Sequence, residues 1–157
     1  MQRRVLLMRH AKSSRDDASL SDHQRPLNAR GLKDASKMAR VLQKLNLIPS
    51  RVLVSDSKRT LETLDGIKSI LGELPTQAMN NLYLASANTL LECMDETAEG
   101  ETMLIISHNP GTELVMYEVT GEYHSMPTTA CALLIGHENT WHCQQVLRPK
   151  DLSHLCE

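Results

Sequence analysis

The chain has 157 residues, of which 41% are hydrophobic and 23% are charged, and its formal net charge is -2. This length suits one domain with a buried core, so we expect residues 1–157 to form a single domain. The small net charge excludes a general attraction to nucleic acid or to an anionic membrane, and no apolar run approaches the length of a membrane span.

Cysteine use and the first residues bear on the cellular compartment. The four cysteines include no C-x-x-C pair, which favours reduced thiols over a disulfide or a metal site. Only four apolar residues, Val5 to Met8, precede Arg9, and this run is too short for the core of a signal peptide. We therefore expect a cytoplasmic protein.

Short runs rich in Val, Ile and Leu alternate with longer amphipathic stretches. In chain order, the pattern predicts strand Arg4–Met8, helix Ala29–Leu45, strand Arg51–Ser55, helix Ser57–Leu71, helix Ala87–Thr97, strand Thr102–Ser107, helix Pro110–Gly121, strand Ala130–Ile135 and strand Trp141–Val146. The alternation predicts an α/β fold with three layers, a mostly parallel central sheet with helices on both faces. The last two strands could also form a hairpin through Gly136–Thr140 and add an antiparallel edge.

Polar and cationic residues follow three of the predicted strands. Open α/β sheets bind ligands beyond the carboxyl ends of their strands, and parallel strands end at the same edge. We therefore expect two histidines and at least two arginines to converge there. The three clusters are Arg9-His10-Ala11-Lys12-Ser13, Ser55-Asp56-Ser57-Lys58-Arg59 and Ser107-His108-Asn109-Pro110-Gly111.

This combination of residue types suits phosphoryl transfer. Guanidinium groups match phosphate oxygens and stabilise transferring charge. Neighbouring cations disfavour the protonated form of a histidine, so the ring stays neutral and can attack phosphorus. Asn109 is predicted to cap the following helix with Pro110 as its first residue, which places His108 near free backbone N–H groups.

Simpler interpretations exist for each residue taken alone. Arg59 could form a surface pair with Glu62, three residues further on, and His108 could be a capping residue. The functional interpretation depends on the coincidence at three strand ends. The remaining histidines stand in polar contexts and are predicted to lie at the surface: His23, His124, His137, His142 and His154.

Five stretches, in the expected order, resemble the histidine phosphatase superfamily and most closely its small SixA-type phosphohistidine phosphatases. They are LLMRHAKSS, DHQRPLNARG, VLVSDSKRTLET, LIISHNPGTELV and MPTTACALL. The resemblance implies the phosphoglycerate mutase-like fold of that superfamily and requires no metal or organic cofactor. Two positions depart from the family pattern: Thr60 stands where the family often has Ala, and Glu62 stands where it often has Gln.

The resemblance also implies roles for individual residues. His10 would be the nucleophile that becomes phosphorylated, while Arg9 and Arg59 would bind the phosphoryl oxygens. His108 would complete the pocket and stabilise the transferring group. Asn109, through its backbone, and Ser13 would also contact the phosphate.

The absence of a carboxylate from one segment of the sequence indicates the substrate class. Larger members of the superfamily carry a glutamate proton donor after a middle strand, and the matching region here, Asn80–Ala85, holds no carboxylate. An alkyl phosphate needs such a donor, whereas phosphohistidine expels imidazole, whose conjugate acid has a pKa of about 6.5. The gap favours phosphoramidate, acyl phosphate or anhydride substrates. Asp22, or its neighbours Asp16 and Asp17, could still act as a proton donor or could be solvated loop charges.

The chain leaves little length for a lid, which suits a phosphorylated side chain of another protein. We therefore expect a phosphatase that acts on a phosphohistidine-bearing carrier domain. The alternatives are a broad small-molecule phosphatase or mutase of the same superfamily, and a catalytically inactive module that binds phosphorylated ligands. A metal-dependent hydrolase using His10, His108 and a carboxylate is less favoured, because arginines stand where acidic ligands are usual.

Overall fold

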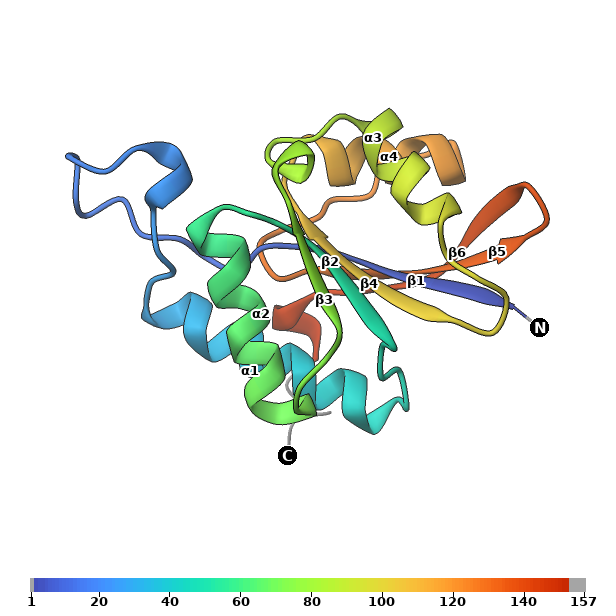
Figure 1. Cartoon of the computed structure of the whole chain (residues 1–157), viewed down its shortest axis with the longest axis horizontal. Coiled ribbons are helices and arrows are strands. Elements are labelled where there is room, and N and C mark those ends of the chain that lie inside the picture. The colour runs from blue at the N-terminus through green and yellow to red at the C-terminus, as the bar shows by residue number, and fades with distance from the viewer. Residues whose placement is uncertain (1, 153–157) are drawn as a thin grey trace.

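A computed structural model describes residues 2–152, which form one six-stranded sheet between two layers of helices (Figure 1). The strand order is β3-β2-β4-β1-β5-β6. The strands are β1 (Arg3–Arg9), β2 (Arg51–Ser55), β3 (Thr76–Met79), β4 (Thr102–Ser107), β5 (Cys131–His137) and β6 (Thr140–Leu147).

Helices cover both faces of this sheet. In Figure 1, α1 and α2 lie below the sheet while α3 and α4 lie above it. The predicted three-layer α/β architecture is confirmed. The helices are α1 (Ala29–Lys44), α2 (Lys58–Leu71), α3 (Ala87–Asp95) and α4 (Gly111–Thr120), with short 3-10 turns η1 (Asp22–Gln24), η2 (Asn80–Leu82) and η3 (Pro149–Asp151).

The sheet is mostly parallel, as expected. β1 and β2 both pair in parallel with β4, and β3 pairs in parallel with β2. β5 runs antiparallel to β1, and β6 returns antiparallel to β5, so the predicted hairpin is confirmed. Because β1, β2 and β4 are parallel neighbours, their carboxyl ends meet at one edge of the sheet.

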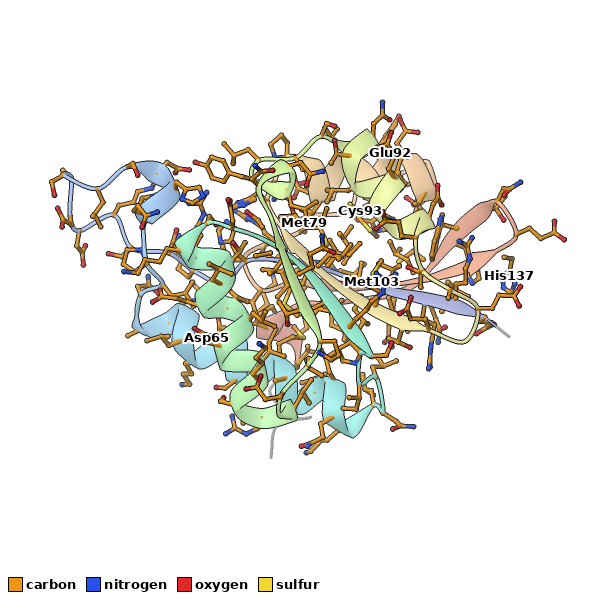
Figure 2. All side chains as sticks on the ribbon, in the orientation of Figure 1. Asp65, Met79, Glu92, Cys93, Met103 and His137 are labelled. Carbon is orange, nitrogen blue, oxygen red and sulfur yellow. The ribbon has the colours of Figure 1, made fainter. Side chains whose placement is uncertain are left out.

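Alternating side chains of the central strands fill two separate cores. Leu6 and Met8 of β1 pack toward α1 and α2, whereas Val5 and Leu7 pack toward α3 and α4. Each fully buried side chain of this size contributes about 1.5–3 kcal/mol by leaving water. Figure 2 shows part of the second core, in which Met79, Cys93 and Met103 lie between the sheet and α3. The strand ends are therefore held on a rigid base.

Close backbone approaches fix the loops at the carboxyl edge. A Cβ atom at Gly31 would lie 2.1 Å from the carbonyl oxygen of Lys12, so glycine lets the start of α1 press against the segment after β1. Gly111 meets the carbonyl oxygen of Ala85 in the same way at the start of α4. Any larger residue at either position would push these loops apart.

β3 is the element that the sequence prediction missed. It lies at the edge of the sheet, and its sequence, Thr-Gln-Ala-Met, is largely exposed. It therefore lacks the apolar run that identifies a strand buried on both faces.

Helix ends also differ in detail. α4 begins at Gly111 after Pro110, so the prediction that Asn109 caps this helix is wrong by one residue. α3 ends at Asp95 rather than at Thr97. Among residues 2–152, none of the helices combines the length and the apolar character needed to cross a bilayer. Cys93 and Cys131 are buried free thiols, while Cys156 and His154 lie outside the described residues.

Candidate active site

His10, Arg59 and His108 come from three different strand ends and meet in one buried cluster. The two imidazole ring centroids lie 5.3 Å apart, and the rings are tilted by 57°. Arg59 Nε lies 3.3 Å from His10 Nε2, and Arg59 Nη2 lies 3.3 Å from His108 Nδ1. The exposed fractions of His10, Arg59 and His108 are only 5%, 2% and 1%. The expected convergence is confirmed.

The His10 ring points an unprotonated nitrogen at this cluster. Its Nδ1 lies 2.7 Å from the carbonyl oxygen of Ala11, which can only accept, so Nδ1 carries the proton and donates it. Nε2 is left with a lone pair and accepts from Arg59 Nε–H. Burial is the main reason that the pKa of His10 falls to about 4. The cations of Arg59, Arg9 and Arg25 contribute to this fall, and the Ala11 hydrogen bond opposes it. Near pH 7 this ring is therefore neutral.

A buried serine contacts the His108 ring and holds it in position. Its Nε2 lies 2.8 Å from Ser55 Oγ, and its Nδ1 accepts from Arg59 Nη2 because an arginine N–H can only donate. Burial is the main reason that the pKa of His108 falls to about 3, and the neighbouring His10 and Arg59 add to the effect. Both histidines are therefore neutral in the ligand-free site.

Arg59 stands in the first turn of α2, where Ser57 caps the helix by accepting from the backbone N–H of Thr60. Its tip is occupied by Asp22: Nη1 donates to the Asp22 carbonyl oxygen at 2.6 Å, and Nη2 donates to Asp22 Oδ2 at 3.0 Å. A surface pair with Glu62 is wrong, because Glu62 instead accepts the backbone N–H of Leu27 at 2.8 Å. The residue that departs from the family pattern thus anchors the loop before α1.

Arg9 is less fully satisfied than Arg59. Its Nη1 donates to the carbonyl oxygen of Met126 at 3.2 Å, but its buried Nε has no hydrogen-bond partner within residues 2–152. An unsatisfied buried donor costs about 1–3 kcal/mol, and more when it is charged. The Arg9 side chain also lines the cleft beside His10, and guanidinium groups bind anions.

These residues line a cleft of about 600 Å³ that is much larger than one phosphoryl group. Ser13 Oγ accepts from Arg25 Nη1 at 2.8 Å, and Asn109 Nδ2 donates to the Met126 carbonyl oxygen at 2.9 Å. Both residues line the cleft, and their contacts with a phosphate, through the backbone in the case of Asn109, stay predictions. Cations dominate the wall. The lining includes Arg9, His10, Lys12, Ser13, Arg15, Asp16, Asp22, Arg25, Arg59, Leu84, His108, Asn109 and Thr128.

Asp22 is the carboxylate that contacts the cluster directly, and it is ionised. The Tyr83 hydroxyl donates to Asp22 Oδ2 at 2.5 Å, and Arg25 contacts Oδ1 at 3.1 Å. The Tyr83 hydrogen bond, helped by the contacts with Arg59 and Arg25, holds the pKa of Asp22 far below its usual range against the opposing effect of burial. Its role as a proton donor stays a prediction, and this ligand-free arrangement does not favour it.

Three residues around Asp22 escaped the sequence prediction. Tyr83 packs its ring edge-on against His108, with centroids 5.4 Å apart, and Arg25 bridges Asp22 and Ser13. His23 is partly exposed, as predicted, but its Nε2 also lies 2.8 Å from Asp56 Oδ1, a contact that the sequence did not indicate. Arg25 lies within a family-like stretch and Tyr83 within the segment searched for an acid, so both positions carried a signal.

The arrangement of the titratable side chains also bears on metal binding. Residues 2–152 contain no group of three or more His, Cys, Asp or Glu side chains arranged to hold a metal ion. The side chains that surround His10 are instead arginines, which bind anions.

Comparisons with known proteins agree with this geometry. The sequence profile of the histidine phosphatase superfamily (branch 1) matches residues 5–83. An uncharacterized chloroplastic protein of Arabidopsis thaliana is 35% identical over 153 residues, covering 88% of this chain and 69% of the relative. The structure of the protein histidine phosphatase SixA complexed with tungstate is 28% identical, with a TM-score of 0.86, and covers 98% of this chain and 100% of that one.

A phosphoglycerate mutase from Bacillus anthracis shares the fold at 10% identity, with a TM-score of 0.74 over 99% of this chain and 97% of the mutase. Sequence profile, sequence relative and solved structures therefore point the same way as the site. The chain belongs to the histidine phosphatase superfamily and is of the SixA type.

Proposed function

We propose that this protein is a phosphatase that removes the phosphoryl group from phosphohistidine on another protein, through a covalent intermediate on His10. Membership of the superfamily supports phosphatase activity. The observation that carries the proposal is the lone pair of His10 Nε2, which faces the Arg59 guanidinium in a cation-lined cleft. A neutral imidazole so placed can attack phosphorus at neutral pH.

The proposed first step needs no cofactor. The phosphoryl oxygens bind Arg59 and Arg9, which both line the cleft, and phosphorus is held in front of His10 Nε2. The bond between phosphorus and the substrate nitrogen breaks while a bond between phosphorus and Nε2 forms. Water then attacks the phosphorus of phosphorylated His10, which releases inorganic phosphate and restores the ring.

His108 supports the negative charge in this proposal. A bound phosphoryl dianion raises the pKa of a neighbouring histidine, so Nδ1 of His108 takes up a proton and donates to a phosphoryl oxygen. Ser55 keeps the ring in position during this change through its contact with Nε2.

The choice of phosphohistidine depends on the leaving side. Tyr83 lies in the segment where the resemblance places the acid of larger relatives, and the carboxylate that it contacts, Asp22, is ionised. A site without an available proton donor suits a leaving group that departs without one, as imidazole does. The cleft of about 600 Å³ has room for the histidine side chain that carries the phosphoryl group.

The test compares substrates and traps the intermediate. The protein is incubated with a phosphohistidine-bearing carrier domain and, separately, with sugar phosphates. The proposal predicts faster turnover of the carrier and acid-labile phosphate bound to His10 after a rapid quench. Faster turnover of the sugar phosphates favours the broad phosphatase instead. Absence of turnover with every substrate favours a binding module, and loss of activity on chelation favours a metal-dependent hydrolase.

A further inference from the structure

We propose that the Asp22 carboxylate recognises the protonated ring of the phosphohistidine leaving group and thereby selects P–N bonds to imidazole over P–O bonds. The inference rests on the proposed function and assigns to Asp22 a role opposite to that of a proton donor. In this proposal Asp22 remains negatively charged throughout the reaction, and its charge stabilises the protonated ring of the substrate.

The position of Asp22 relative to the nucleophile carries the argument. The Arg59 guanidinium spans the site: its Nε–H faces His10 Nε2, while Nη1 and Nη2 at the other end face Asp22. Phosphoryl transfer requires the leaving atom to lie opposite the attacking atom. A phosphoryl group held along this guanidinium, with phosphorus at His10, therefore presents its leaving group toward Asp22.

Asp22 also has supports that survive substrate binding. When phosphoryl oxygens take the Arg59 Nη groups, Asp22 keeps its contacts with the Tyr83 hydroxyl at 2.5 Å and with Arg25 at 3.1 Å. Its side chain is 46% exposed, so a ring in the cleft can reach it. The charged and titratable groups that face it are Arg59, Arg25, Tyr83 and the neutral His108. The neighbouring His23 is turned to Asp56.

The chemistry of phosphohistidine explains why a carboxylate helps. One ring nitrogen carries the phosphoryl group, and the other can take a proton from water. When the P–N bond of this protonated ring breaks, its electron pair returns to the ring nitrogen and neutral imidazole leaves. Phosphorus meanwhile bonds to His10 Nε2, so no proton from the enzyme is needed. An opposite charge within about 4–6 Å raises the pKa of a cationic group by roughly 1–3 units, so the ring stays protonated at higher pH.

The test is the Asp22→Asn variant, which keeps the shape of the side chain and removes its charge. Its kcat/KM is measured from pH 6 to pH 9 on the phosphohistidine-bearing carrier and on p-nitrophenyl phosphate, whose leaving group departs without an acid. We expect roughly a tenfold or larger loss on the carrier at pH 8, which shrinks toward pH 6 because solvent then protonates the ring. Any change on p-nitrophenyl phosphate should be smaller than the loss on the carrier and should not shrink toward pH 6, because no protonated ring leaves from that substrate.

Two further variants complete the design. Asp22→Glu retains the charge and should recover more carrier activity at pH 8 than Asp22→Asn does. Asp17→Asn is the matched control, because Asp17 is an exposed carboxylate of the same loop that bonds to Ser19 and does not line the cleft. Circular dichroism confirms that each variant is folded.

The outcomes separate the two proposals. An equal loss on both substrates, a deficit that does not change with pH, or a Glu variant no better than Asn overturns the role of Asp22 while leaving phosphohistidine hydrolysis intact. If the unsubstituted protein does not hydrolyse the carrier but does hydrolyse p-nitrophenyl phosphate, the proposed substrate is wrong.

Discussion

Arg51 lies at the amino end of β2 and Arg9 at the carboxyl end of β1, so the two arginines stand at opposite edges of the same sheet. Their surroundings differ. Arg51, at the start of β2, donates from Nε to Glu101 at 2.8 Å and from Nη2 to the same carboxylate at 3.2 Å. Arg9, at the end of β1, has a buried Nε without a partner in the described part of the chain. Arg51 therefore forms an ion pair with a carboxylate of the protein, whereas Arg9 forms none within residues 2–152.

The same contrast extends to the histidines. At the carboxyl edge, His10 and His108 are buried next to cations and stay neutral, an arrangement that costs stability below about pH 6.5, where the unfolded chain binds more protons. Active sites commonly sacrifice stability in this way for chemistry. Substitutions at either end of the sheet test this contrast, and substitution of the proposed nucleophile His10 should have the largest effect on activity.

Removing the proposed nucleophile, His10, should have the largest effect. His10→Ala leaves no lone pair in front of phosphorus, and loss of a covalent nucleophile commonly costs about 10⁴-fold or more in kcat. Steady-state turnover and acid-labile label on the protein measure this directly. Turnover near that of the unsubstituted protein would rule out the His10 intermediate.

Arg59→Ala should be the next most severe change. It removes the guanidinium that contacts both histidines, and a lost charge-stabilising donor costs about 3 kcal/mol, or roughly 100-fold in kcat. The measurement is kcat on the carrier, with Arg40→Ala on the exposed side of α1 as the control. A rate within a few-fold of the unsubstituted protein contradicts the assignment.

Acid should destabilise the ligand-free protein through the two histidines. Their folded pKa values of about 4 and about 3 lie below the unfolded value near 6.5, so the unfolded chain binds more protons in this window. Stability is therefore fully present above pH 6.5 and falls as the pH drops toward 4, by about 1.4 kcal/mol per pKa unit and per group at most. Urea unfolding at pH 7.5, 6, 5 and 4.5 measures the slope. His108→Gln should flatten it, and an unchanged slope in that variant would show that His108 is not a source of the acid sensitivity.

Inorganic phosphate should stabilise the protein by filling the site. A ligand at 100 times its dissociation constant adds about 2.7 kcal/mol to the free energy of unfolding. We expect the melting temperature to rise with phosphate concentration, and Arg9→Ala to weaken this rise because it removes the unsatisfied donor. An equal rise in the two proteins would show that phosphate binds elsewhere.

Much of the site followed from sequence because its scaffold is simple. β1, β2 and β4 are buried on both faces, so their apolar runs are unmistakable and the polar residues after them mark one edge. The edge strand β3 has no such run, which is why it was missed.

The contacts around Asp22 could not be predicted in this way. Asp22 is 37 residues from Arg59 and 61 residues from Tyr83, and no periodic pattern links a loop residue to either. Which ring nitrogen of His10 carries the proton also depends on the single Ala11 carbonyl contact, which sequence does not reveal. The residue types at the site and the neutral state of His10 were therefore predictable, whereas its tautomer and the pairing of the side chains needed the structure.

Arg51→Ala tests the other side of the comparison and should have the smallest effect. The side chain is about one-third exposed, so solvent screens its pair with Glu101 and the loss of stability should be about 0.5–1 kcal/mol. Because Arg51 lies at the far end of β2 from His10, kcat and KM on the carrier should stay unchanged while the urea midpoint falls slightly. A clear drop in kcat would mean that the two ends of the sheet are coupled. The distinction between Arg51, which is paired within the protein, and Arg9, which is not, would then fail.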